Sequence, residues 1–118
     1  MNRIVHFEIP ATDPEKSMAF YQTVFGWKFS SFGDYPYWLA ETGDADQPGI
    51  NGAIMQRRDP AQPMTNSIQV ADVQEAIRAI EANGGVLVVP PTPMGTGSFA
   101  FFKDPDGNIL GLWHVRAG

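Results

Sequence analysis

Two stretches of equal length decide the fold: DPEKSMAFYQTVFG at residues 13–26 and DVQEAIRAIEANGG at residues 72–85. Each begins with an aspartate, which can cap a helix, and ends with a glycine, which can stop one. Shifting the first stretch by 59 positions places Asp13 on Asp72 and Gly26 on Gly85. The chain therefore reads as one structural unit written twice. A duplicated unit too small to bury a core alone usually pairs with its copy and leaves a cleft between the two.

Strands flank both predicted helices. Residues 3–9 alternate, which places Val5, Phe7 and Ile9 on one face of a strand and His6 and Glu8 on the other. In the first helix we expect Met18, Tyr21 and Phe25 to point inward. Further strands are expected to begin at residues 27 and 37 and to cover residues 52–56, 65–70, 86–89, 99–103 and 109–115.

The segment 90–98 (PPTPMGTGS) is rich in glycine and proline, so we expect a mobile flap there. The sequence as a whole predicts a single α+β domain of two tandem β-α-β-β-β modules, with curved mixed sheets forming a cleft. Module 1 covers about residues 1–57, a linker about 58–63, and module 2 about 64–118.

Composition narrows the classes of function. The 118 residues include no cysteine, which excludes disulfides and thiolate chemistry. The net charge is −5, and the eight basic residues are scattered apart from one adjacent pair, which argues against nucleic acid as a partner. No apolar run is long enough for a membrane span, and no signal peptide is visible. We expect a soluble, cytoplasmic protein with a small-molecule partner.

Several motifs together resemble the vicinal oxygen chelate superfamily, which includes glyoxalase I, extradiol dioxygenases, fosfomycin-resistance transferases and bleomycin-binding proteins. The motifs are HFEI at 6–9, DPEKS at 13–17, FY at 20–21, VFGW at 24–27, the stretch 72–85, and FKDPDGN at 102–108. The resemblance spans nearly the whole chain. It implies the duplicated fold and a cleft formed within one chain or across two chains of a dimer.

The resemblance also implies four positions at which such proteins bind a metal. In this sequence these positions hold His6, Gly52, Thr65 and Gly111. Only His6 is a normal metal ligand, because glycine has no side chain and a neutral hydroxyl is a weak donor. We therefore assign no metal site and no cofactor, and a divalent metal is disfavoured.

Other roles remain open for the predicted cleft. His6 and Glu8 form either an acid–base pair or a hydrogen-bonded pair without chemistry. Because Gly111 leaves room that a glutamate would fill, the ligand is expected on an aromatic and polar wall. The residues of this wall are Trp38, Thr65, Ser67, Gln69, Gly111 and Trp113.

Three functions remain possible. The first is a metal-free small-molecule-binding protein of the bleomycin-resistance type. The second is a metal-dependent lyase or dioxygenase of the glyoxalase type. The third is a metal-independent lyase or isomerase that uses His6 and Glu8. Exposed aromatic residues and sheet edges predict a homodimer in each case.

Overall fold

Each duplicated stretch forms a helix whose N-terminus is capped by its aspartate. In the computed structural model, which describes residues 1–115, α1 (Pro14–Phe25) starts where Asp13 Oδ1 accepts the backbone N–H of Lys16 at 3.2 Å. Gly26, with φ of 75°, ends the helix. Asp72 caps α2 (Val73–Ala82) through two N–H groups, those of Gln74 and Glu75. Both predicted helices are confirmed.

The chain divides into two units, Val5–Met64 and Met1–Ile4 together with the chain from Thr65 onward. We call them the N-terminal and C-terminal units. β1 (Arg3–Ala11), β2 (Lys28–Ser31), β3 (Tyr37–Glu41) and β4 (Gly52–Gln56) belong to the N-terminal unit, except for the first two residues of β1. β5 (Thr65–Gln69), β6 (Val86–Met94), β7 (Gly97–Lys103) and β8 (Ile109–Val115) belong to the C-terminal unit.

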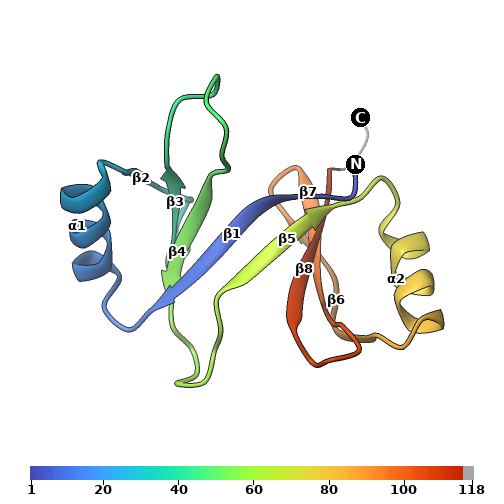
Figure 1. The fold of residues 1–118 in the computed structure, drawn as a ribbon. Coiled ribbons are helices and arrows are strands. Elements are labelled where there is room, and N and C mark those ends of the chain that lie inside the picture. The colour runs from blue at the N-terminus through green and yellow to red at the C-terminus, as the bar shows by residue number, and fades with distance from the viewer. Residues whose placement is uncertain (116–118) are drawn as a thin grey trace. The chain divides into compact units, whose positions relative to one another are not determined.

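Both units follow one plan. The strand order is β2-β3-β4-β1 in the N-terminal unit and β6-β7-β8-β5 in the C-terminal unit. In the first unit β1 runs parallel to β4, and in the second β5 runs parallel to β8. Figure 1 shows α1 beside the strands of the N-terminal unit and α2 beside those of the C-terminal unit. The predicted α+β class and its two β-α-β-β-β modules are therefore confirmed.

The C-terminal unit has a well-packed core under α2. Val73 and Ile77 of the helix are buried against the sheet, as an apolar stripe at helical spacing requires. The remaining buried members of this core are Val70, Ala100, Phe102 and Leu112.

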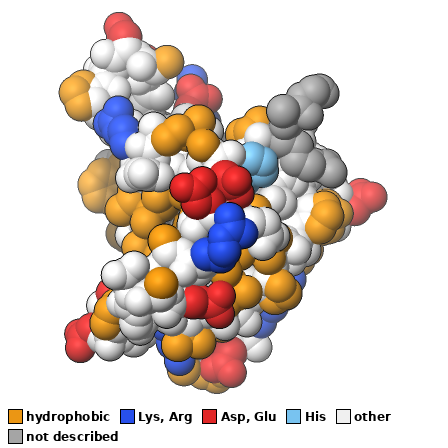
Figure 2. Space-filling model, turned by 90° about the vertical axis from the view of Figure 1, so that its right-hand side faces the viewer, with side chains coloured by type: hydrophobic (Ala, Val, Ile, Leu, Met, Phe, Trp, Pro, Cys, Tyr) orange, Lys and Arg blue, Asp and Glu red, His pale blue; other side chains and the backbone are white. Residues whose placement is uncertain are grey.

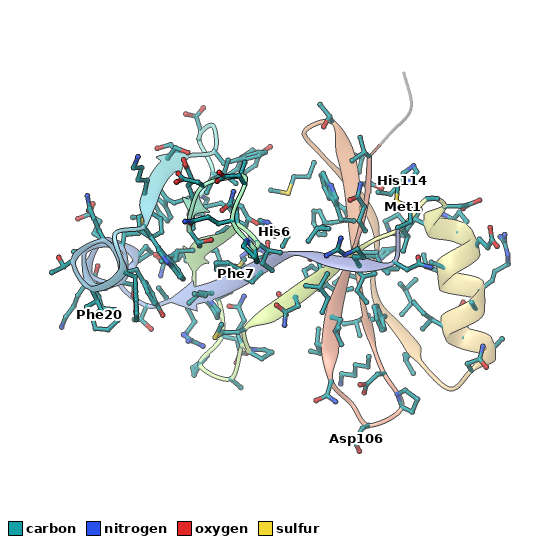
Figure 3. All side chains as sticks on the ribbon, turned by 45° about the horizontal axis from the view of Figure 1, so that its top comes forward. Met1, His6, Phe7, Phe20, Asp106 and His114 are labelled. Carbon is teal, nitrogen blue, oxygen red and sulfur yellow. The ribbon has the colours of Figure 1, made fainter. Side chains whose placement is uncertain are left out.

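Helix α1 is much less covered by its own sheet. Of its residues only Pro14 is buried, and Phe25 is 62% exposed. The expectation that Phe25 points inward is therefore wrong, because its ring lies beside Tyr21 and Trp27 at the end of the helix rather than under it. Figure 3 shows Phe20 projecting from α1 as well.

The expected flap at residues 90–98 is also wrong. β6 continues through the prolines to Met94 and pairs with β7, from Thr92 opposite Phe99 to Met94 opposite Gly97. β6 is the outer strand of its sheet, where a residue without an N–H is tolerated, and its register shifts between Leu87 and Thr92. Gly95, with φ of 60°, turns the hairpin.

Among residues 1–115 no helix is long and apolar enough to cross a membrane. On the face seen in Figure 2, acidic, basic and hydrophobic side chains are interspersed.

Candidate functional site

Three polar side chains meet on one face of the sheet in the N-terminal unit. His6 and Glu8 project from β1 on the same side, as the alternation of the strand predicts. Tyr37 of β3 places its hydroxyl between them, 2.6 Å from His6 Nε2 and 2.5 Å from Glu8 Oε2. The direct distance from His6 Nε2 to Glu8 Oε2 is 4.0 Å, so the phenol is the bridge.

The hydrogen bonds fix which histidine nitrogen carries a proton. Tyr37 donates its only proton to Glu8. Its oxygen can then only accept from His6, so Nε2 must carry a hydrogen. In the neutral imidazole, Nδ1 is therefore left as a hydrogen-bond acceptor.

Burial keeps this arrangement in place near neutral pH. Burial lowers the pKa of His6, and the negative charge of Glu8 opposes this to a smaller extent. The pKa of Tyr37 is raised far above its ordinary value, first by burial and then by the charge and hydrogen bond of Glu8. The phenol therefore remains a donor, and the imidazole is neutral.

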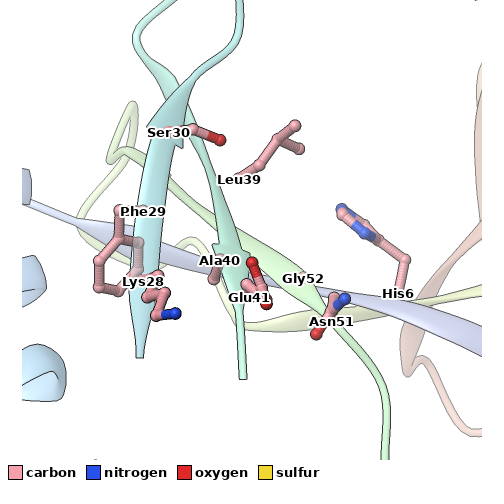
Figure 4. Close-up of a pocket in the computed structure, with 9 residues that line it drawn as sticks. All are labelled: His6, Lys28, Phe29, Ser30, Leu39, Ala40, Glu41, Asn51 and Gly52. Carbon is pink, nitrogen blue, oxygen red and sulfur yellow. The ribbon is translucent and has the colours of Figure 1, made fainter. Parts of the chain in front are cut away.

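His6 opens onto a pocket of about 420 Å³ that lies wholly within the N-terminal unit. Figure 4 shows its walls: β2 and β3 on one side, the residues that lead into β4 below, and His6 opposite. Of its apolar residues, Leu39 lies on the face of His6 and Tyr37, whereas Phe29 and Ala40 are paired on the opposite face of the strands. The polar part is formed by His6, Lys28, Ser30, Glu41 and Asn51.

Tyr37, Lys28 and Asn51 were missed by the sequence analysis. Tyr37 lies 31 residues from His6 and 29 from Glu8 along the chain, and only strand pairing brings them together. One signal was available: Tyr37, Leu39 and Glu41 share a face, and the charged Glu41 marks it as the polar one.

Trp38 lies on the opposite face of β3 from Tyr37. It pairs with the fully buried Ile54 and lines a second hollow, of about 350 Å³, between α1 and the sheet. The structure therefore does not bring Trp38 together with His6, and the predicted ligand contact at Trp38 gains no support.

The other predicted wall residues lie together in the C-terminal unit. Strand pairing sets Ser67 opposite Gly111 and Gln69 opposite Trp113, so these four share a face with Thr65. The space beside Gly111 is already filled, because a Cβ there would collide with Ser67 Oγ and lie 3.3 Å from the ring of Phe101. The ring of Trp113 lies over Gly97, and Trp113 is half-buried. Their role in binding remains a prediction.

The residues at the four metal-binding positions do not fit a metal. Glu8 and Ser67 occupy equivalent positions in the two modules, and their strand partners are Ala53 and Gly111. The metal-binding position of the first module that corresponds to Gly111 is therefore Ala53 rather than Gly52. Alanine and glycine offer no side-chain donor, and His6 Nε2 already donates to Tyr37. Within residues 1–115 no group of three or more histidine or carboxylate side chains could hold a metal ion.

Comparisons with known proteins agree with this fold. Residues 3–112 match the model of the Glyoxalase/Bleomycin resistance protein/Dioxygenase superfamily. A lactoylglutathione lyase of Neisseria meningitidis is 32% identical, over 98% of this chain and 93% of that protein.

Solved structures show the same architecture at low identity. A superfamily member from Vibrio splendidus superposes with a TM-score of 0.66 at 16% identity, over 97% of this chain and 98% of the other. Methylmalonyl-CoA epimerase from Mycobacterium tuberculosis gives 0.68 at 16% identity, over 97% and 88%. At this identity the likeness concerns the fold alone.

Proposed function

Since the chain belongs to the glyoxalase/bleomycin resistance protein/dioxygenase superfamily, we propose that it is a metal-independent member that binds a small organic molecule. The binding site is the pocket lined by His6 in the N-terminal unit. The observation that carries this proposal is the chain of hydrogen bonds His6–Tyr37–Glu8, which orients the imidazole without a metal. The protein thus resembles the bleomycin-resistance type in function.

The pocket has the composition of a small-molecule site. Leu39 offers an apolar surface to a ligand, and a few fixed polar groups can orient it. A volume of about 420 Å³ is within the usual range for such sites.

One observation favours a second candidate, a metal-independent lyase or isomerase. A half-buried, neutral imidazole with Nδ1 as acceptor is equipped to take a proton from a bound molecule, and Glu8 would stabilise the charge through Tyr37. The two candidates differ in turnover, which only the second requires.

The name of the Neisseria relative suggests a lyase, and the remaining alternative is a metal-dependent lyase or dioxygenase of the glyoxalase type. The side chains at the four metal-binding positions argue against this alternative. The first module offers only His6, whose Nε2 is already hydrogen-bonded to Tyr37, and the second offers only Thr65, a weak metal ligand.

The first test is metal content together with ligand binding. Untagged protein, purified without chelator, is offered nickel, zinc, manganese and iron and then analysed by elemental mass spectrometry. We expect no stoichiometric metal, and we expect small-molecule fragments to shift NMR signals of residues in the N-terminal pocket. His6→Ala should weaken the binding of fragments that donate a hydrogen bond to the imidazole.

Stoichiometric metal that is lost in His6→Ala would overturn the proposal and place the metal-dependent lyase first. Fragments that shift no residue of the pocket would overturn it as well. A matched control is His114→Ala, because His114 lies in the C-terminal unit and its Nδ1 contacts the carbonyl oxygen of Val70.

A further inference from the structure

The side-chain amide of Asn51 has a fixed orientation. The backbone N–H of Thr42 lies 2.9 Å from Asn51 Oδ1, and a backbone N–H can only donate. The oxygen of the amide must therefore face Thr42. The Thr42 hydroxyl, which donates to the carbonyl of Ile50 at 2.6 Å, lies 3.3 Å from the same oxygen.

This orientation leaves the amide nitrogen of Asn51 as the group offered to the pocket. Thr42 directly follows β3 and Asn51 directly precedes β4, so the two strands hold the contact in place. In Figure 4 the nitrogen end of Asn51 is turned toward the side of the pocket where His6 lies. Asn51 thus supplies hydrogen-bond donors, whereas His6 Nδ1 supplies an acceptor.

The charges that line the pocket oppose one another. Lys28 and Glu41 are directly paired across β2 and β3, so both project on one face and carry opposite charge. A ligand with a net charge would be attracted by one and repelled by the other. A neutral ligand with an apolar body against Leu39 meets no such conflict.

We propose that the pocket binds a neutral ligand with a primary or secondary amide group, or an equivalent adjacent C=O and N–H pair. The ligand oxygen accepts from Asn51 Nδ2, and its N–H donates to His6 Nδ1. Thr42 acts as a positioning residue for Asn51. This inference rests on the proposed function, because it names the ligand class of the same pocket.

The experiment uses two probes of similar size. Benzamide has both the oxygen and the N–H, whereas acetophenone has only the oxygen. Binding is followed by NMR titration of the labelled full chain. Since a hydrogen bond contributes a modest net free energy, we expect benzamide to bind about three- to tenfold more tightly than acetophenone.

Asn51→Asp replaces the donor nitrogen by an oxygen and keeps the acceptor for Thr42. We expect it to weaken both probes by about three- to tenfold, whereas His6→Ala should remove only the advantage of benzamide. Asn51→Ala, which removes the donor without adding a charge, should weaken both probes in the same way and serves if Asn51→Asp does not fold. Asn66→Asp, the same chemical change at an exposed position of β5, is the matched control and should leave both affinities unchanged.

The possible failures are distinguishable. If neither probe shifts any residue of the N-terminal pocket, the proposed function fails together with the ligand class. If both probes bind there with equal affinity, or if Asn51→Asp binds them as the wild type does, the amide assignment fails and the proposed function stands.

Discussion

The hydroxyl of Tyr37 lies between His6 Nε2 and Glu8 Oε2, and its proton goes to the carboxylate. Burial lowers the pKa of His6 in the folded protein, whereas the unfolded chain titrates near the ordinary value of about 6.5. Between these two pKa values the unfolded state binds more protons than the folded state. The folded protein is therefore expected to lose stability as the pH falls through this interval.

The variant Tyr37→Phe tests the bridge. Without the phenol, Glu8 becomes the nearest partner of His6 Nε2, and its charge then favours the imidazolium more strongly. We expect the pKa of His6 to rise relative to the wild type and the loss of stability at acidic pH to shrink. NMR titration of the His6 ring measures the pKa, and the ring of His114 serves as internal reference.

An unchanged or lower pKa of His6 in Tyr37→Phe would show that the phenol does not separate the two groups. A wild-type His6 that titrates above about 6.5 would contradict the dominance of burial.

Part of the site was predictable from single residues. The alternation of β1 was enough to place His6 and Glu8 on one face. It was harder to predict which residues of β3 lie on the face of His6, because Tyr37 and Trp38 are adjacent aromatic residues and a shift of one position exchanges their faces. The pairing of Trp38 with Ile54 decides it, and sequence patterns do not contain that pairing.

At the scale of elements, the helices were predictable because their signals are local. Asp13 and Asp72 each accept hydrogen bonds from the backbone of the first turn, at the spacing that the sequence displays. The extent of β6 was not predictable, because prolines and glycines are typical of loops and only the position of this strand at the edge of its sheet tolerates them.

Helix α2 is buried against its strands more completely than α1, and this gives a prediction for the stability of α2 variants. Ile77 is 6% exposed within the core of the C-terminal unit, so Ile77→Ala removes buried methyl groups and leaves a cavity. We expect the free energy of unfolding to fall by about 2–5 kcal/mol, measured by urea denaturation. The neighbouring Arg78→Ala is the control, because Arg78 is exposed and its truncation should change stability by no more than about 0.5 kcal/mol. Equal losses in the two variants would contradict the packing of α2.

At the scale of the whole molecule, the duplication predicted the plan of both units. The offset of 59 relates Glu8 to Ser67, but the strand partners Ala53 and Gly111 are 58 positions apart. The connection between the first and last strands is thus one residue longer in one module than in the other. A constant offset of 59 therefore predicts the position of the second helix correctly. In the last strand it is wrong by one position, and a shift of one position moves a side chain to the other face of the sheet.

The exposed face of α1 is the surface through which we expect the molecule to associate. Phe20, Val24 and Phe25 are 56%, 54% and 62% exposed, and the stacked rings of Tyr21 and Trp27 lie beside them. Exposed apolar groups that gather in this way commonly mark an interface. We expect the chain to form a homodimer that covers this face.

Light scattering at micromolar concentration measures the mass of the particle directly. We expect a dimer for the wild type and a monomer for Phe25→Glu, because a buried, unpaired carboxylate strongly disfavours association. Since Phe25 is mostly exposed within the chain, this change should leave the fold of the monomer intact. Thr23→Glu introduces the same charge at an exposed position of α1 and should remain dimeric. A monomeric wild type, or dissociation by both variants alike, would remove α1 as the dimer interface.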